Sequence, residues 1–403
     1  MLNNNFNFEL KTNVVSGADS IKSIYDFLKK ENYKKIGLVL DKNLYKNSKY
    51  IRNFVKIFSR KTILKKILYF NEIHEPTYQY LNQIVSELKK KKNNKFDCMI
   101  AIGGGSAIDH AKGIATLLKN TGNALKYRGF PEKLNPSIPL IAIPSTSGTG
   151  AELAYNAVFI DSESKTKLGI NTRNNYPILS ILDPKIMISS PKNVVLNSSL
   201  GALIRSIDVM FNRKSNKISR IFSENSFKLL FNNLPKVLKK RNNLEYWSNM
   251  QWGAYLSVAA LLNSSSSGPA AKISYYLSAN YNISQGLGYA ISGIYLFERI
   301  HEKGFYEYSK LFDLIEKKPS KKNLSKKEKS EFVIKNLIKI LKYNKLTIKR
   351  ENITKNENEK ILRSISKKLN ISKSNNLIIL DRPNNPIVLN RKDLTIIINK
   401  VLK

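Results

Sequence analysis

The stretch from residue 98 to residue 115 reads CMIAIGGGSAIDHAKGIA, and it restricts the possible fold more than any other part of the sequence. An apolar run of strand length ends in three glycines and a serine, and residues with helical spacing follow at once. Gly103, Gly104 and Gly105 can adopt backbone angles that other residues avoid, so that bare N–H groups approach a ligand. With the Ser106 hydroxyl and the positive end of the helix, this turn predicts a phosphate site.

Asp109 supports the same interpretation, because it falls in the first turn of the expected helix, where a carboxylate is favoured. The alternative is a plain strand-to-helix turn, although three consecutive glycines exceed what such a turn needs. The glycine spacing also differs from the G-x-G-x-x-G pattern of many dinucleotide-binding turns. The stretch therefore predicts a bound phosphate without naming the molecule that carries it.

A second stretch, IPSTSGTGAE at residues 143–152, opens from another apolar run into small, hydroxylated residues. Ser145, Thr146 and Thr149 offer donors to a phosphate, a ribose or an amide, and the alternative is an ordinary Ser/Thr-rich loop. Asp41 ends the first apolar run, where an acid can bind the two ribose hydroxyls of an adenosine and would repel a 2′-phosphate. An equally good interpretation of Asp41 is a cap for a helix over KNLYKN.

The first half of the chain alternates short apolar runs with helical spacing, which predicts an α/β domain built on a parallel sheet. Residues 157–170 instead predict a hairpin around a polar turn. From about Pro191 onward, apolar residues recur every three or four positions, which predicts an all-α helical bundle. We therefore expect an α/β nucleotide-binding domain at 1–190 and a helical domain at 191–403. The expected strands are 35–41, 98–104, 140–144 and 178–183, and the expected helices of the bundle are 198–211, 218–234, 247–262, 270–281, 290–300 and 332–343.

Composition excludes several classes of protein. No apolar run reaches the ~20 residues that span a bilayer, and the first residues lack the pattern of a signal peptide. A single cysteine, Cys98, excludes an internal disulfide and fits a cytoplasmic location. The net charge of +38 suggests a nucleic-acid binder or the codon bias of an AT-rich genome. We favour codon bias, because the lysines are spread out and the basic stretches 89–95 and 317–329 resemble solvated connections.

The motifs LVLD, HEPTYQ, AIGGGSAIDHAKGIA, IPSTSGTGAELAYNAVFIDSESKTKLGI and ILDPKI resemble the iron-containing alcohol dehydrogenase family in order and spacing. The resemblance implies hydride transfer between NAD or NADP and an alcohol or carbonyl, a dimer, and a cleft between an α/β and an all-α domain. KLGIN at residues 167–171 resembles a branch that acts on keto-sugar acids, so a small polar, anionic or sugar-derived substrate is expected. Glu75 departs from the family, which usually has Asn there.

The resemblance also implies roles for single residues. Lys167 has an alternative interpretation as one more surface lysine of a hairpin. The implied cofactor contacts are Asp41 at the adenosine ribose, Gly104, Gly105 and Ser106 at the pyrophosphate, Ser145, Thr146 and Thr149 along the adenine and phosphate channel, and Asn156 and Lys167 near the nicotinamide ribose.

The family's metal is normally held by one Asp and three His, and the corresponding residues are absent from this sequence. The matching positions carry Gly201, Arg205, Ala271 and Gln285, and Tyr275 replaces the second His of an H-x-x-x-H helix. Gly and Ala offer no side-chain ligand, and Arg is a cation. We therefore expect neither iron nor zinc at this position.

The three histidines of the chain, His74, His110 and His301, do not form a pair at ligand spacing. His110 is expected on the helix surface or at the cofactor's edge. Arg205 would face the cleft and could stabilise a developing alkoxide by charge, or form an ion pair with Asp208 or another acid. The remaining catalytic candidates are Lys272, beside a ligand position, and Tyr275, which offers a hydroxyl for proton transfer.

Two functions follow from these features. One is a metal-independent NAD(P)-dependent oxidoreductase, and the other is a catalytically inactive descendant that still binds a nucleotide. A sugar-phosphate cyclase of the dehydroquinate synthase type shares the fold, but it also needs a metal held by acid and histidines. A nucleic-acid binder rests on charge alone and would lose its affinity steeply with added salt.

Overall fold

The computed structural model describes residues 5–62, 64–70, 75–90, 95–264, 268–319, 323–348, 360–361 and 385–402. His74 lies outside these residues, as do parts of the two basic stretches. The chain divides into two compact units, one of residues 10–196 and 233–255 and the other of residues 1–9, 197–232 and 256–403. We call them the α/β unit and the helical unit. The expected split into independent domains near Pro191 stays a prediction.

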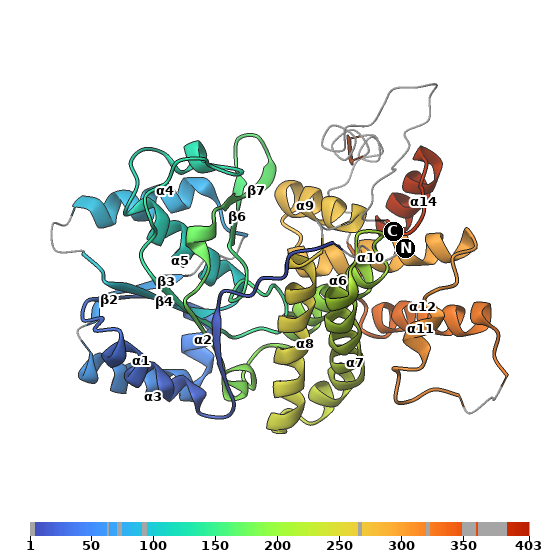
Figure 1. Cartoon of the computed structure of the whole chain (residues 1–403), viewed down its shortest axis with the longest axis horizontal. Helices are drawn as coiled ribbons and strands as arrows, with labels where there is room; N and C mark the ends of the chain where they lie inside the picture. The colour runs from blue at the N-terminus through green and yellow to red at the C-terminus, as the bar shows by residue number, and fades with distance from the viewer. Residues whose placement is uncertain are drawn as a thin grey trace. The chain divides into compact units, whose positions relative to one another are not determined.

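The α/β unit is built on a six-stranded parallel sheet, as the sequence predicted (Figure 1). The four predicted strands form its centre, where their aliphatic side chains are buried on both faces. The two outer strands had not been predicted. In sheet order, the strands are β1 (Asn13–Ser16), β8 (Leu179–Leu182), β5 (Leu140–Pro144), β4 (Cys98–Gly103), β2 (Ile36–Asp41) and β3 (Leu64–Phe70).

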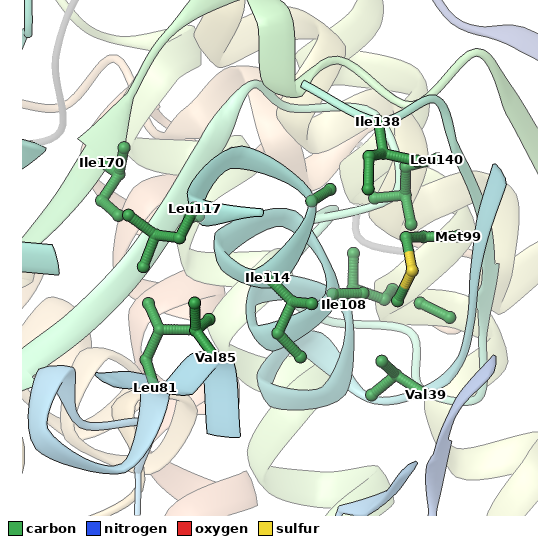
Figure 2. Packing of buried hydrophobic residues seen from close by; sticks show 14 of the residues in the cluster. Val39, Leu81, Val85, Met99, Ile108, Ile114, Leu117, Ile138, Leu140 and Ile170 are labelled. Carbon is green, nitrogen blue, oxygen red and sulfur yellow. The ribbon is translucent and has the colours of Figure 1, made fainter. Parts of the chain in front are cut away.

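Helices cover both faces of this sheet. One apolar cluster joins the sheet to α4 and α5, and Figure 2 shows part of it, with Leu81, Ile114 and Met99 from three different elements. A second cluster joins the opposite face to α1 and α3. The helices of this part are α1 (Ile24–Lys30), α2 (Lys42–Asn47), α3 (Lys49–Lys61), α4 (Tyr78–Lys90) and α5 (Gly105–Leu117), with 3-10 turns η1 (Ser20–Ser23), η2 (Ala124–Tyr127), η3 (Arg173–Asn175) and η4 (Pro184–Met187).

The predicted hairpin consists of β6 (Asn156–Asp161) and β7 (Thr166–Asn171), which pair antiparallel. Ala157, Phe159 and Ile170 point into the cluster that contains α4 and α5. The hairpin therefore lies against the same helix that begins at the glycine turn.

The six helices predicted for the second half are all present. They are α6 (Lys192–Met210), α7 (Lys217–Lys239), α8 (Leu244–Leu262), α9 (Pro269–Tyr281), α10 (Gln285–Glu302) and α12 (Lys326–Tyr343), to which the structure adds α11 (Ser309–Phe312) and α14 (Arg391–Val401). The basic stretch 317–329 is not a connection throughout, because α12 begins inside it. Ser325 and Glu328 form a capping box that fixes this start.

None of the helices in the described parts of the chain is long and apolar enough to cross a membrane.

Candidate functional site

The glycine turn joins β4 to α5, as predicted. Gly104 caps the helix in an extended conformation, and its carbonyl oxygen accepts from the N–H groups of Ala107 and Ile108. The first N–H groups of a helix have no partner within it. Those of Gly105 and Ser106 therefore stand at the positive end of α5, where an anion is stabilised.

The reason for the glycines differs from the predicted one. None of the three has a positive φ, and that of Gly104 is −73°. Space decides instead: a Cβ on Gly103 would lie 2.7 Å from the Cβ of Ala107, and one on Gly105 would lie 2.5 Å from the Thr149 hydroxyl oxygen. At Gly104 the nearest atom would be a methyl of Thr146 at 3.5 Å, an ordinary contact. Gly103 and Gly105 thus serve close packing, and Gly104 leaves the turn open.

The Ser/Thr-rich loop lies against this turn. Its Thr146 and Thr149 flank Gly104 and Gly105, and the Ser145 N–H donates to the Gly103 carbonyl oxygen at 2.9 Å. Ser145 is buried, and its own carbonyl oxygen accepts from the Ser190 hydroxyl. The loop thus brings the two threonines to the turn, and their contact with a cofactor stays a prediction.

Asp41 is a helix cap, one of the two interpretations of the sequence. Its Oδ1 accepts from the Leu44 N–H at 2.9 Å at the start of α2. The residue also lies beside the glycine turn, since a Cβ on Gly103 would meet the Cβ of Asp41 at 2.9 Å. Capping uses one carboxylate oxygen, so a second role at a ribose stays compatible with it.

Asp109 does not lie in the first turn of α5, as had been predicted, because the helix begins at Gly105 and no acid falls in its first turn. Its carboxylate instead accepts from the Val158 N–H of β6 at 3.1 Å. Burial raises the pKa of Asp109 to about 6, while the nearby Lys112 and Lys167 act in the opposite direction. The observed contact is with the hairpin, and a contact with the cofactor stays a prediction.

Lys112 is a buried residue that the sequence analysis missed. Its ammonium donates to the carbonyl oxygens of Ala151 and Ala154 at 2.6 Å and of Asn156 at 2.9 Å. Burial lowers the pKa of Lys112 to about 8. Lys112 thereby connects the segment after the Ser/Thr-rich loop to α5. The only sign of this role in the sequence is that the lysine lies within an apolar helix.

His110 is fully buried, so its predicted place on the helix surface is wrong. The ring makes edge contacts with Tyr80 and Phe159, and its Nδ1 lies 3.0 Å from the Ser106 carbonyl oxygen. Burial lowers the pKa of His110 to about 4, so the ring is neutral at physiological pH. A core aromatic position explains these contacts.

Lys167 is also buried, which contradicts its interpretation as a surface lysine. Its side chain is 1% exposed, and its ammonium lies 2.7 Å from Glu75 Oε2. Asn156, the other predicted contact of the nicotinamide ribose, donates from Nδ2 to Asn171 Oδ1 at 2.7 Å. Glu75, which stands where the family usually has Asn, is therefore the counter-ion of Lys167.

The helical unit holds the predicted catalytic residues. Arg205 is buried and donates to the Ser257 hydroxyl at 3.0 Å. One turn further along α6, Asp208 accepts from the Tyr289 hydroxyl at 2.7 Å and the Gly268 N–H at 3.1 Å. Burial raises the pKa of Asp208 to about 6, and the positive charge of Arg205 opposes this.

Tyr275 and Lys272 lie together on α9, with the ammonium 5.6 Å from the centre of the tyrosine ring. Tyr275 is also near enough to act electrostatically on Tyr289, whose pKa burial raises well above its ordinary value. Of these residues, Asp208 and Tyr289 form a hydrogen bond, while Arg205 and Tyr275 act on them electrostatically. Tyr289 had not been predicted, because it lies 81 residues from Asp208 in sequence.

Comparison with known proteins decides the family. Residues 11–184 match the family model described as iron-containing alcohol dehydrogenase, and residues 195–400 match that of the family's C-terminal domain. The chain belongs to the iron-containing alcohol dehydrogenase family. It is an oxidoreductase family, and the resemblance found in the sequence is confirmed.

Two curated relatives and one solved structure are similar to this chain. Alcohol dehydrogenase 4 of Schizosaccharomyces pombe is 29% identical over 66% of this chain and 61% of its own length. The NAD-dependent methanol dehydrogenase of Bacillus methanolicus is 26% identical over 70% of this chain and 72% of its own length. Sulfoacetaldehyde reductase of Bifidobacterium kashiwanohense, solved with NAD+, has a TM-score of 0.81 at 16% identity, covering 98% of both chains, which shows a shared fold.

Of the four residues that the sequence analysis matched to the family's metal ligands, only Gln285 has a side chain that could coordinate a metal ion, and the absence of a metal stays a prediction. Gly201, Arg205 and Ala271 supply no neutral or anionic donor. A Cβ on Gly201 would lie 3.1 Å from the Cα of Gly286, so α6 and α10 approach closely at this point. Within the described ranges, no group of three or more His, Cys, Asp or Glu residues is placed to hold a metal ion.

Proposed function

We propose that this chain is an oxidoreductase that transfers a hydride between a nicotinamide dinucleotide and an alcohol or carbonyl carbon, without a metal at the family's metal position. The observation that carries the proposal is the open turn at Gly104, where the positive end of α5 can receive a pyrophosphate. When bound, the dinucleotide would donate or accept the hydride. The substrate class remains the one the sequence suggested, a small polar, anionic or sugar-derived molecule.

The residues around the turn fit a dinucleotide in two ways. Ser106, Thr146 and Thr149 place hydroxyl groups near the N–H groups of the first helical turn. Asp41 lies next to Gly103 with one oxygen used for capping, so that the other can accept from ribose hydroxyls. A carboxylate there disfavours a 2′-phosphate, so the proposal is NAD rather than NADP.

The positive charge that a reacting carbonyl oxygen needs would come from Arg205. A guanidinium offers two parallel donors and a charge that it keeps at every physiological pH. Ser257 holds one of its nitrogens, and Asp208 lies close enough to act as its counter-charge. Tyr275, beside Lys272, would supply or remove the proton.

A second function has an observation of its own in favour. Without the family's metal ligands, the chain could bind a nucleotide and not turn it over. The two proposals share the glycine turn and differ only in the helical unit. Binding therefore tests what they share, and turnover separates them.

The experiment is a fluorescence titration with NADH on wild type and two glycine variants of the same helix region. Gly104→Ala places a methyl group where the fold has room, so it should leave stability nearly unchanged while narrowing the anion site. We expect NADH affinity to fall by about tenfold or more, since a pyrophosphate must approach the backbone closely.

Gly113→Ala is the matched control. Its Cβ would lie 2.8 Å from Leu81 and Phe159, so this variant should lose stability but keep its NADH affinity. Unchanged NADH affinity in Gly104→Ala would refute the phosphate assignment. Equal losses in both variants would show that the effect reports folding rather than the turn.

A further inference from the structure

The α/β unit contains a cavity that no function described above uses. It measures about 230 Å³ and lies between β3, at the edge of the sheet, and the helices α4 and α5. Val39 of β2 and Ile114 of α5 line it with buried apolar side chains. An engineered apolar cavity of about 150 Å³ binds benzene. The larger cavity therefore has room for an aromatic ring that carries a substituent.

The cavity is separate from the glycine turn. The turn follows the carboxyl end of β4, whereas the strand residues that line the cavity, Val39 and residues 66–69, precede the carboxyl ends of β2 and β3. On α5 the lining residues are His110 and Ile114, about 6 and 12 Å beyond Ser106 along the axis at 1.5 Å per residue. The cavity thus extends over the face of the sheet, away from the proposed pyrophosphate site.

One side of the cavity is aromatic. Tyr80 of α4 and His110 of α5 both line it, and their ring centroids are 5.6 Å apart in an edge arrangement. His110 is fully buried, and burial lowers its pKa to about 4, so this side carries no charge at physiological pH. Aromatic rings pack well in edge and offset contacts with one another. This side of the cavity therefore favours a ring as the part of a ligand that enters.

Lys66 places a positive charge beside this apolar space. Side chains alternate along a strand, so Lys66 shares a face of β3 with Leu68, which packs on the cluster of α4 and α5. Lys66 is half-buried, and among the described residues no acid pairs with its ammonium. Glu87 also lines the cavity, but it is exposed, and Gln83 donates to its carboxylate at 3.4 Å. The half-buried charge at this cavity is therefore positive, which favours an anionic substituent.

We propose that this cavity binds a small aromatic carboxylate, with the ring against Tyr80 and His110 and the carboxylate on the Lys66 ammonium. The ring would remove its apolar surface from water. The ammonium would donate charge-assisted hydrogen bonds, which are stronger than those between neutral groups. The proposal involves no nucleotide, so it is independent of the proposed function. Without a ligand, an inward-pointing lysine would serve only to protect an edge strand from pairing with another chain.

The test compares indole-3-carboxylate with its neutral amide, indole-3-carboxamide, by saturation-transfer NMR on wild type and three variants. Lys66→Met removes the charge and keeps a long apolar side chain. Ile84→Phe adds volume to a half-buried residue that lines the cavity. Lys56→Met is the control, because Lys56 is an exposed lysine of α3, which covers the opposite face of the sheet. Thermal unfolding checks that each variant is folded.

We expect wild type to bind the carboxylate about tenfold or more tightly than the amide, the effect of a hydrogen bond to a charged group. Lys66→Met should abolish this preference, and Lys56→Met should keep it. Ile84→Phe should weaken both ligands by about tenfold, because it fills the space for the ring.

Four results would overturn the proposal. One is a wild type that binds neither compound, and another is a preference for the carboxylate that survives in Lys66→Met, which would leave the lysine only its role at the edge strand. The third is an equal loss in Lys56→Met, which would show that the effect reports the overall charge of the chain. The last is unchanged binding in Ile84→Phe, which would place the ring outside the cavity.

Discussion

Asp109 in the α/β unit, which is half-buried, and Asp208 in the helical unit, which is buried, are two acids in different settings. Burial raises the pKa of each to about 6. Asp109 accepts from the backbone of a strand and has Lys112 close by, and Lys112 itself binds three backbone carbonyl oxygens. Asp208 accepts from Tyr289, a side chain of another helix, and from one N–H group.

The difference shows where sequence carries structural information. In the α/β unit, Asp109 and Lys112 bind backbone groups of residues 151–158, which lie 39 to 49 residues further along the chain. In the helical unit, the contacts of Arg205 and Asp208 come from α8, from α10 and from Gly268, the N-cap of α9, which only the packing of helices brings together. The partners in the first arrangement are backbone groups, whereas Ser257 and Tyr289 in the second contribute side chains.

The largest effect should come from the buried cation of the α/β unit. Lys112→Met would leave the carbonyl oxygens of Ala151, Ala154 and Asn156 without their donor. We expect the free energy of unfolding to fall by about 3 kcal/mol or more, because each unsatisfied buried group costs about 1–3 kcal/mol. Denaturant unfolding measures this.

Lys119→Met is the control for that variant, since Lys119 follows the same helix and is exposed. It should change the free energy of unfolding by less than about 0.5 kcal/mol. Equal losses in the two variants would remove the distinction between a buried structural lysine and the many surface lysines.

A smaller effect, on the pH dependence of stability, should come from the raised pKa values of the two acids. A folded-state pKa of about 6, above the ordinary value of 3.8, means that the folded chain holds these protons to higher pH than the unfolded chain. The stability that each acid contributes is therefore present near pH 4 and is lost as pH rises to about 6. In Asp208→Asn this dependence disappears.

Relative to wild type, Asp208→Asn should gain about 2 kcal/mol between pH 4 and pH 7, and Asp109→Asn should gain a similar amount. Urea unfolding of the three proteins at several pH values measures the difference. If a variant kept the wild-type pH dependence, ionising the replaced acid would not lower the free energy of unfolding. The burial described for that acid would then be wrong.

The sequence predicted the central strands, the hairpin and the bundle helices, because these have long apolar runs or regular spacing. It missed β1 and β3, which are short or interrupted by lysines, as in LKKILYF. Asp41 was found because it ends an apolar run and Gly103 because it begins three consecutive glycines, and the structure shows that they end neighbouring parallel strands. The order of the motifs along the chain was therefore enough to predict that Asp41 and the glycine turn belong to one site.

The remaining parts of the site lacked a local signal. In a chain with 68 Lys and Arg residues, only its place within an apolar helix separates the buried Lys112 from the surface lysines. Asp109 was wrongly predicted to lie in the first turn of α5. The residue at which this helix begins depends on the conformation of Gly104, which the sequence does not specify. The Asp208–Tyr289 contact joins two helices, and only the packed structure shows it.

The most direct test of the account is a single titration of NADH into protein whose iron and zinc content has been measured, before and after treatment with a chelator. The account predicts far less than one metal ion per chain and an NADH affinity that the chelator leaves unchanged. One iron or zinc per chain, with NADH-dependent turnover that disappears on chelation, would contradict the claim that Arg205 has taken the place of the metal.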